Sequence, residues 1–150
     1  MISVTIETPR QHEVVHLLEK SVAYIRSLYP EEQADTFKME ELTRKRSKFF
    51  VVRHQQSNKA IGCGAYIGCG RRVVELKHMF VDASSRGLGA GRALLAFIEK
   101  IAVEDGVKKI ILETSQKQVD AIGLYKAFGY VECDPYTDYH QEDIFMQKML

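Results

Sequence analysis

Two arginines and three glycines in the second half of the chain form a segment that could bind an anionic group. The run Arg-Gly-Leu-Gly-Ala-Gly begins at Arg86 and ends at Gly91, and Arg92 follows it. A segment of helical periodicity comes next, so the run opens a helix, where backbone amides have no internal partner and the peptide dipoles add partial positive charge. A Cβ on any of the three glycines would stand between those amides and a ligand. We therefore expect binding of a phosphate or pyrophosphate, assisted by both guanidinium groups.

The spacing of this run differs from the two commonest phosphate-binding loops. A Walker loop ends in Gly-Lys-Ser or Gly-Lys-Thr, whereas Arg92 and Ala93 follow Gly91 here. A dinucleotide fingerprint needs a third glycine three residues after the second, and Arg92 and Leu94 occupy the two places where it could stand. The sequence thus predicts neither of these sites.

The segment resembles motif A of the GNAT superfamily, the acyl-CoA-dependent N-acyltransferases, in which Arg/Gln-x-x-Gly-x-Gly/Ala cradles the pyrophosphate of coenzyme A. A second match runs from Ala121 to Tyr130 and follows the family pattern Ala-x-x-x-Tyr-x-x-x-Gly-Phe/Tyr, with Gln118 where the family usually has Asn. The resemblance covers essentially the whole chain and implies an N-acetyltransferase that uses acetyl-CoA as cosubstrate and no metal. The cofactor contacts that it implies are Met79, Phe80, Val81, Arg86, Gly87, Leu88, Gly89, Ala90, Gly91, Arg92, Gln118 and Tyr125.

Acylation of an amine requires removal of a proton, because a lysine-like amine is neutral in only about one molecule in 2500 at pH 7. Glu75 is the first candidate base, since it stands six residues before Val81, in the register where several family members place a catalytic glutamate. It could instead be a strand carboxylate paired with Lys77 or Arg72. His78 is the second candidate, because imidazole titrates near neutrality. Strand alternation makes His78 face away from Glu75 unless a bulge intervenes.

Tyr125 is the residue that the family pattern assigns to the leaving group. A thiolate with a pKa near ~8.5 departs more easily when a hydroxyl donates a proton to it. From helical spacing alone, Tyr125 could equally be a core aromatic beside Ala121 and Phe128. The resemblance further implies that amides near Met79 and Val81 hold the pantetheine arm and polarise the thioester carbonyl. The expected reaction is direct transfer within a ternary complex.

The acceptor site is expected to come from residues 27–43 and from the loop at residues 134–142. The candidate substrate-binding side chains are Tyr29, Glu75, Tyr136 and Tyr139. An aromatic and acidic loop suits an amine with an apolar body, through cation–π and charge contacts, although it could also be a solvated hairpin. We expect the primary amine of a small molecule, such as an amino acid or a related metabolite.

Two other functions stay open at this point. An enzyme that acetylates a protein lysine or N-terminus would need an extended acceptor groove, which no sequence feature indicates. A non-catalytic acyl-CoA sensor would keep the glycine-rich loop but would not need Glu75 and Tyr125.

The elements that must position these residues follow from periodicity. Strands are predicted at residues 2–7, 49–54, 60–67, 73–81, 109–114, 130–133 and 143–149, and helices at residues 11–27, 39–45, 89–104 and 118–128. Short connections favour antiparallel neighbours, whereas the strands at 73–81 and 109–114 are joined through a helix and should be parallel. The prediction is one α/β (α+β) domain over residues 1–150, with a mixed, mostly antiparallel seven-stranded sheet and helices on both faces. The resemblance implies the same fold.

Composition is that of an ordinary globular domain. With 45% hydrophobic residues, 27% charged residues and a net charge of +1, the chain shows no signature of nucleic-acid binding. No apolar run approaches ~18 residues, so no membrane association is expected, and we predict a cytoplasmic protein that could form a homodimer. Three cysteines without a Cys-x-x-Cys pair favour neither a disulfide framework nor a zinc knuckle.

The pattern His-Glu-x-x-His at residues 12–16 matches zinc peptidases. On a helix, both histidines would point away from the apolar stripe that includes Val14, Leu18 and Val22. A catalytic zinc site also needs a third ligand, and none stands at a recognisable spacing. The sequence therefore predicts no metal site.

Overall fold

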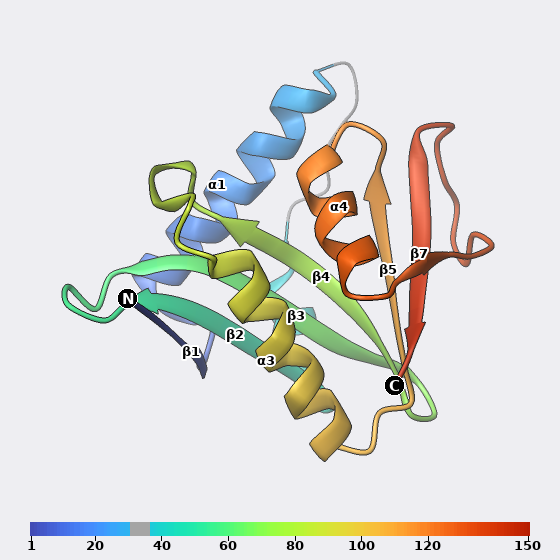
Figure 1. Cartoon of the computed structure of the whole chain (residues 1–150), viewed down its shortest axis with the longest axis horizontal. Helices are drawn as coiled ribbons and strands as arrows, with labels where there is room; N and C mark the ends of the chain where they lie inside the picture. Colours follow the sequence, from blue (N-terminus) through green and yellow to red (C-terminus); the bar gives the residue numbers. More distant parts are fainter. Residues whose placement is uncertain (31–36) are drawn as a thin grey trace.

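Seven strands form a single sheet in the order β1-β2-β3-β4-β5-β7-β6 in a computed structural model that describes residues 1–30 and 37–150 (Figure 1). All neighbouring strands are antiparallel except β4 and β5, which are parallel. The predicted mixed, mostly antiparallel sheet is thus confirmed. The strands are β1 (Ile2–Ile6), β2 (Ser47–His54), β3 (Ala60–Gly70), β4 (Val73–Val81), β5 (Lys109–Ser115), β6 (Val131–Glu132) and β7 (Asp143–Met149). The helices are α1 (His12–Leu28), α2 (Met39–Leu42), α3 (Ala90–Glu104) and α4 (Val119–Ala127), with a 3-10 turn η1 (Ala83–Ser85).

The predicted boundaries are wrong by a few residues where strand pairing overrides local propensity. The helix predicted at residues 39–45 ends at Leu42, and β2 begins at Ser47 because Ser47 already pairs with Ile67 of β3. Between them, Arg46 has a φ of 70° and turns the chain into the sheet.

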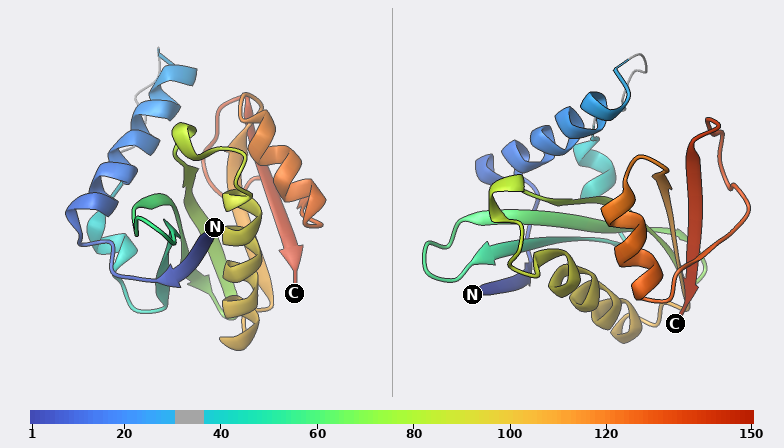
Figure 2. Two further views of the ribbon diagram at one scale, coloured as in Figure 1. Left: turned by 60° about the vertical axis from the view of Figure 1, so that its left-hand side comes forward. Right: turned by 45° about the horizontal axis from the view of Figure 1, so that its top comes forward.

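Helices cover both faces of the sheet (Figure 2). The uninterrupted apolar run in β2 explains this, because successive side chains of a strand point to opposite faces. Phe49 and Val51 pack with α1 and α2 on one face, whereas Phe50 and Val52 pack with α3 on the other. The sheet therefore lies between two hydrophobic cores.

The His-Glu-x-x-His pattern lies at the start of α1. His12 and His16 are exposed on α1, and the Glu13 carboxylate accepts hydrogen bonds from Arg53 and from the amide of Ala60. Residues 1–30 and 37–150 contain no group of three or more His, Cys, Asp and Glu side chains that could hold a metal. In the same two ranges, no helix combines the length and apolar character needed to cross a membrane.

Strands β4 and β5 diverge part-way along their length. Their pairing is confined to residues 73–76 of β4 and 109–112 of β5, and beyond this point β5 pairs only with β7. Figure 1 shows the two strands separating between the C-terminal part of α1 and helix α4. This divergence opens the cleft that contains most of the residues selected from the sequence.

Candidate active site

A β-bulge in β4 brings both candidate bases to the same side of the sheet. Lys77 lies opposite Ala65 and Phe80 lies opposite Cys63, so two residues of β4, His78 and Met79, face one residue of β3. The backbone is irregular at His78, which has a φ of 56°. The alternation of a regular strand would have separated Glu75 from His78, and the bulge instead places both in the lining of one cavity.

Gly64 stands opposite the bulge. A Cβ at Gly64 would lie 2.7 Å from Met79 Sδ, which is closer than real contacts allow, and 3.3 Å from Ile98 Cδ1, which is tight. The absence of a side chain at Gly64 therefore leaves room for the Met79 side chain in its present position. This contact could not be predicted from the sequence because it depends on the register between β3 and β4.

The cleft consists of two adjoining cavities, which we call the loop cavity and the carboxylate cavity. The loop cavity has a volume of about 380 Å³ and includes Arg86, Gly89 and Arg92. The carboxylate cavity has a volume of about 470 Å³ and includes Glu41, Glu75 and Glu113. Five residues line both: Ser21, Ile25, Met79, Gln118 and Tyr125.

The loop cavity gathers the residues predicted to bind coenzyme A. All of them line it except Leu88, whose side chain is 45% exposed and lies outside the lining. Gly89 caps α3 in the left-handed conformation with a φ of 73°. The first hydrogen bond of the helix runs from Ala93 N to Gly89 O (3.0 Å), so the preceding amides of the turn have no acceptor within the helix. Such a turn can bind an anion.

Asp82 holds the start of this loop in place. Its amide donates to Ile61 O at 2.8 Å, and its carboxylate accepts hydrogen bonds from Lys20 Nζ at 3.3 Å and from Ser84 at 3.1 Å. Burial alone would raise the pKa of Asp82, but the hydrogen bonds from Lys20 and Ser84 outweigh it and lower that pKa. The loop is thus tied to both α1 and β3.

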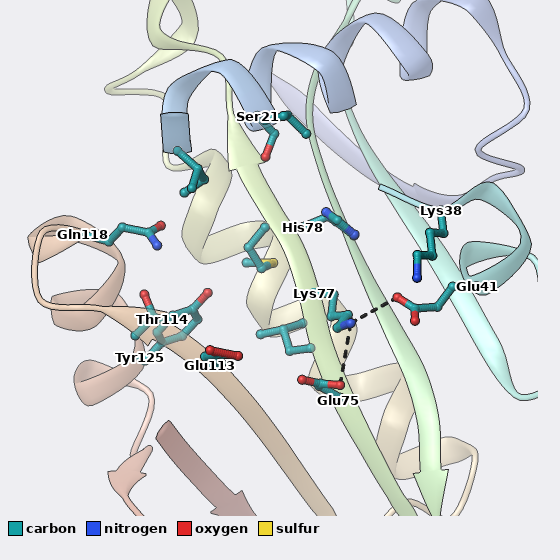
Figure 3. Close-up of a pocket in the computed structure, with 14 residues that line it drawn as sticks. Ser21, Lys38, Glu41, Glu75, Lys77, His78, Glu113, Thr114, Gln118 and Tyr125 are labelled. Atoms are coloured by element: carbon teal, nitrogen blue, oxygen red, sulfur yellow. Dashed lines mark hydrogen bonds and ion pairs between the residues drawn. The ribbon is translucent and has the colours of Figure 1, made fainter. Parts of the chain in front are cut away.

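The carboxylate cavity carries charged groups from several elements (Figure 3). Lys77 Nζ lies 3.1 Å from Glu41 Oε1 and 4.0 Å from Glu75 Oε1. The hydroxyl of Tyr136 donates to Glu75 Oε2 at 2.9 Å. Burial lowers the pKa of His78, and the charge of Lys77 adds to this, while Glu41 opposes it. The His78 imidazole is therefore neutral at neutral pH and able to accept a proton.

Tyr125 lies where the two cavities meet. Its side chain is 6% exposed, and its ring packs 5.6 Å from that of Tyr130. Burial raises the pKa of the Tyr125 hydroxyl, which keeps its proton at neutral pH and can donate it to a hydrogen bond.

Comparison with known proteins assigns the chain to a family. Residues 12–130 match the model of the acetyltransferase (GNAT) family. The chain belongs to the GNAT family. It is therefore an acetyl-CoA-dependent N-acetyltransferase, as the two sequence motifs indicated.

Individual GNAT relatives agree over the full length. The protein is 34% identical to an IAA acetyltransferase from Azospirillum brasilense, over 99% of this chain and 98% of the relative. A solved acyl-CoA N-acyltransferase from Klebsiella pneumoniae, itself described as putative, superposes with a TM-score of 0.82 at 26% identity, over 100% and 98% of the two chains. The fold is also that of the PaiA N-acetyltransferase from Thermoplasma acidophilum, solved in complex with coenzyme A (TM-score 0.78, 15% identity, 100% and 99% covered).

Glu113 is a residue of this GNAT site that the sequence analysis did not select. It lies on β5 and lines the carboxylate cavity beside Glu75 (Figure 3). Glu113 is exposed as a whole residue, but partial withdrawal of its carboxyl group from water, together with the negative charges of Asp143 and Glu75, raises its pKa to about 7. The available signal was a glutamate directly after the apolar run of a strand, on the face opposite to the buried residues Ile110 and Leu112.

None of the three tyrosines predicted to bind the acceptor lines the carboxylate cavity, although Tyr136 reaches it through its hydrogen bond to Glu75. Tyr136 and Tyr139 pack edge-on against Phe145 at 5.0 Å and 6.0 Å between ring centroids. Tyr29, at the end of α1, lies under Lys117 Nζ at 4.5 Å. Part of the predicted acceptor segment, residues 31–36, lies outside the described residues. The roles of the three tyrosines stay predictions.

Proposed function

We propose that this GNAT enzyme transfers the acetyl group of acetyl-CoA to the primary amine of a small molecule, an amino acid or a related metabolite, in a ternary complex. Coenzyme A would occupy the loop cavity, and the amine would occupy the carboxylate cavity. The observation that carries the proposal is that both cavities share Tyr125 and Met79, so a thioester and an amine bound side by side would meet there.

The acceptor cavity supports a small substrate. Its volume of about 470 Å³ is within the range of small-ligand pockets, and carboxylates from three elements line it. The relative from Azospirillum brasilense, which matches over nearly its whole length, is named for the acetylation of IAA rather than of a protein.

Direct transfer is supported by the placement of the cysteines. Cys63 is fully buried, and burial raises the pKa of its thiol to about 12, so a thiolate nucleophile is disfavoured. Within the described residues, no cysteine lines either cavity. Initial-rate measurements at several concentrations of both substrates should give intersecting double-reciprocal lines. Parallel lines would indicate an acyl-enzyme and contradict the ternary complex.

We assign the side-chain roles on the same geometry. Tyr125 donates a hydrogen bond to the leaving sulfur, and the amide groups of the bulged end of β4 polarise the thioester carbonyl. Glu75 and His78 are the candidate proton acceptors from the sequence, and both line the cavity where the amine would bind.

The test begins with binding. Acetyl-CoA and desulfo-CoA should both raise the melting temperature, and a screen of amines should then reveal release of free thiol. Thermal stabilisation without thiol release from any amine would favour the acyl-CoA sensor instead.

Two substitutions test the proposed roles. Tyr125→Phe should lower kcat by about 100-fold, as expected for the loss of one acid–base group. Glu75→Gln should also lower kcat, and both variants should keep nearly unchanged affinity for acetyl-CoA. Tyr130→Phe is the matched control, because the Tyr130 ring packs against Tyr125 but lines neither cavity. Normal turnover in both test variants would refute the assigned roles.

A further inference from the structure

Three carboxylates lie together on the sheet face that α1 and α2 cover. In the strand registers, Glu75 lies opposite Ile111 of β5, Glu113 lies opposite Phe145 of β7, and Asp143 lies opposite Ser115 of β5. Residues two apart in a strand share a face, so Glu113 is a diagonal neighbour of both Glu75 and Asp143. Glu113 is thus the central member of the group and lines the carboxylate cavity.

Glu75 and Glu113 differ in the side chains that contact their carboxylate groups. Glu75 Oε2 accepts the hydroxyl of Tyr136 at 2.9 Å, and Glu75 Oε1 lies 4.0 Å from the ammonium of Lys77. The hydrogen bond ties Glu75 to the loop before β7, and the ion pair ties it to its own strand. Glu113 has no such cationic or hydroxyl partner within hydrogen-bond distance among the contacts of residues 1–30 and 37–150, and it faces the cavity (Figure 3).

The charges around Glu113 favour its protonated form. Glu113 as a whole residue is exposed, but its carboxyl group is partly withdrawn from water in the cleft, and this raises its pKa from 4.5 to about 7. The negative charges of Asp143 and Glu75 and a hydrogen bond with Asp143 add to this effect, whereas Lys77 opposes it. A general base works best when its pKa lies near the working pH, because it is then both ionised and able to hold a proton. The titratable groups that face this part of the cleft are Glu75, Lys77 and His78 of β4, Asp143 of β7, Tyr136 and Cys133 of the β6–β7 segment, and Lys38 and Glu41 near α2.

We propose that Glu113 is the catalytic carboxylate that takes the proton from the acceptor amine, and that Glu75 is a positioning residue that holds Tyr136 and the loop before β7. This inference rests on the proposed function and deepens it. It gives to Glu113 the proton transfer for which the sequence offered Glu75 and His78 as candidates.

The proton balance is complete with the groups named. The bound ammonium gives one proton to the Glu113 carboxylate, directly or through water. The freed lone pair forms the C–N bond while the C–S bond breaks, and its electron pair stays on sulfur, to which Tyr125 donates a hydrogen bond. The second nitrogen proton ends on the thiol, and Glu113 returns its proton to solvent. The products are the amide, the thiol of coenzyme A and one released proton.

The experiment is the pH dependence of kcat at saturating amine and acetyl-CoA, with an amine found in the thiol-release screen. The wild type should show an inflection near pH 7, with activity rising as Glu113 ionises. Glu113→Gln should lower kcat about 100-fold and remove that inflection. Glu104→Gln, an exposed carboxylate at the end of α3, is the matched control and should behave as the wild type.

Substitutions at the two neighbouring carboxylates, Asp143 and Glu75, distinguish a catalytic role from a positioning role. Asp143→Asn should move the inflection to lower pH with a plateau within about threefold of the wild type, because a like charge beside Glu113 is removed. Glu75→Gln should also move the inflection to lower pH but lower the plateau. An inflection that persists in Glu113→Gln, or that stays in place in Asp143→Asn, would overturn the assignment.

A direct measurement of the Glu113 pKa by NMR tests the inference without an amine from the thiol-release screen and without relying on the activity of a variant. In ¹³C-glutamate-labelled wild-type protein, one side-chain carboxyl resonance should titrate near pH 7 and be absent in Glu113→Gln, whose folding is checked by circular dichroism. Titration of that group below pH 5 would overturn the inference. Failure of every amine to release thiol from the wild type would instead refute the proposed function.

Discussion

Replacement of Gly89 by alanine should destabilise the protein, whereas the same replacement at Gly123 should stabilise it. Neither glycine has an atom within 4 Å of the position where a Cβ would stand, so no steric clash separates the two cases. The backbone does separate them, because Gly89 has a φ of 73° and Gly123 lies inside α4.

The magnitudes follow from these conformations. An L-residue in the left-handed region costs about 1–2 kcal/mol, and the smaller entropy of the unfolded chain offsets about 0.4–1 kcal/mol of this. Gly89→Ala should therefore lower the free energy of unfolding by about 1 kcal/mol. Gly123→Ala should raise it by about 0.5–1 kcal/mol, the ordinary gain from replacing glycine inside a helix.

The assay is thermal and urea unfolding of both variants beside the wild type. A difference of about 1.5–2 kcal/mol between them corresponds to about 3–8 °C in melting temperature for a domain of this size. Acetyl-CoA should stabilise Gly123→Ala as much as the wild type but Gly89→Ala less, because the new Cβ stands at the amides of the loop cavity. Shifts of the same sign in both variants would refute the assignment of the left-handed cap.

Three further predictions concern the frame around the site. Hydrogen bonds from Arg53 lower the pKa of Glu7 from 4.5 to about 2, although burial opposes this. The ionised Glu7 should therefore add up to about 3 kcal/mol to the free energy of unfolding above pH 4.5, and this contribution should be lost as the pH falls towards 2. Urea unfolding at pH 6 and pH 2 should show a smaller loss in Glu7→Gln than in the wild type, and equal losses would contradict this. Gly64→Ala should cost about 1–3 kcal/mol and weaken acetyl-CoA binding, because its Cβ displaces Met79; unchanged calorimetric affinity would argue against a role of the bulge. Tyr136→Phe keeps the ring but loses a hydrogen bond to a carboxylate, so KM for the amine should rise about fivefold with KM for acetyl-CoA unaltered.

Local patterns selected residues that the fold brings together around the loop cavity. The glycine-rich turn, the helix after it and the helix that carries Tyr125 are each encoded within about a dozen consecutive residues, so periodicity and turn chemistry suffice to find them. The loop cavity accordingly contains every predicted contact except Leu88.

The acceptor side depends on pairings between distant segments, which a single sequence does not display. The orientation of His78 follows from a bulge opposite Gly64, and the environment of Glu113 follows from its position between β4 and β7. Ser21 and Ile25 of α1 line both cavities, although the sequence predicted neither as a site residue. These features are set by tertiary structure, and the helix or strand propensities of the residues do not predict them.

The divergence of β4 from β5 leaves two interior strand edges facing each other beyond Leu76 and Leu112. Exposed strand edges normally invite pairing with a foreign strand and hence aggregation. Here α1 and α4 flank the opening, as Figure 1 shows. The backbone groups that the two strands no longer share are thus available to hydrogen-bond a ligand that lies between them.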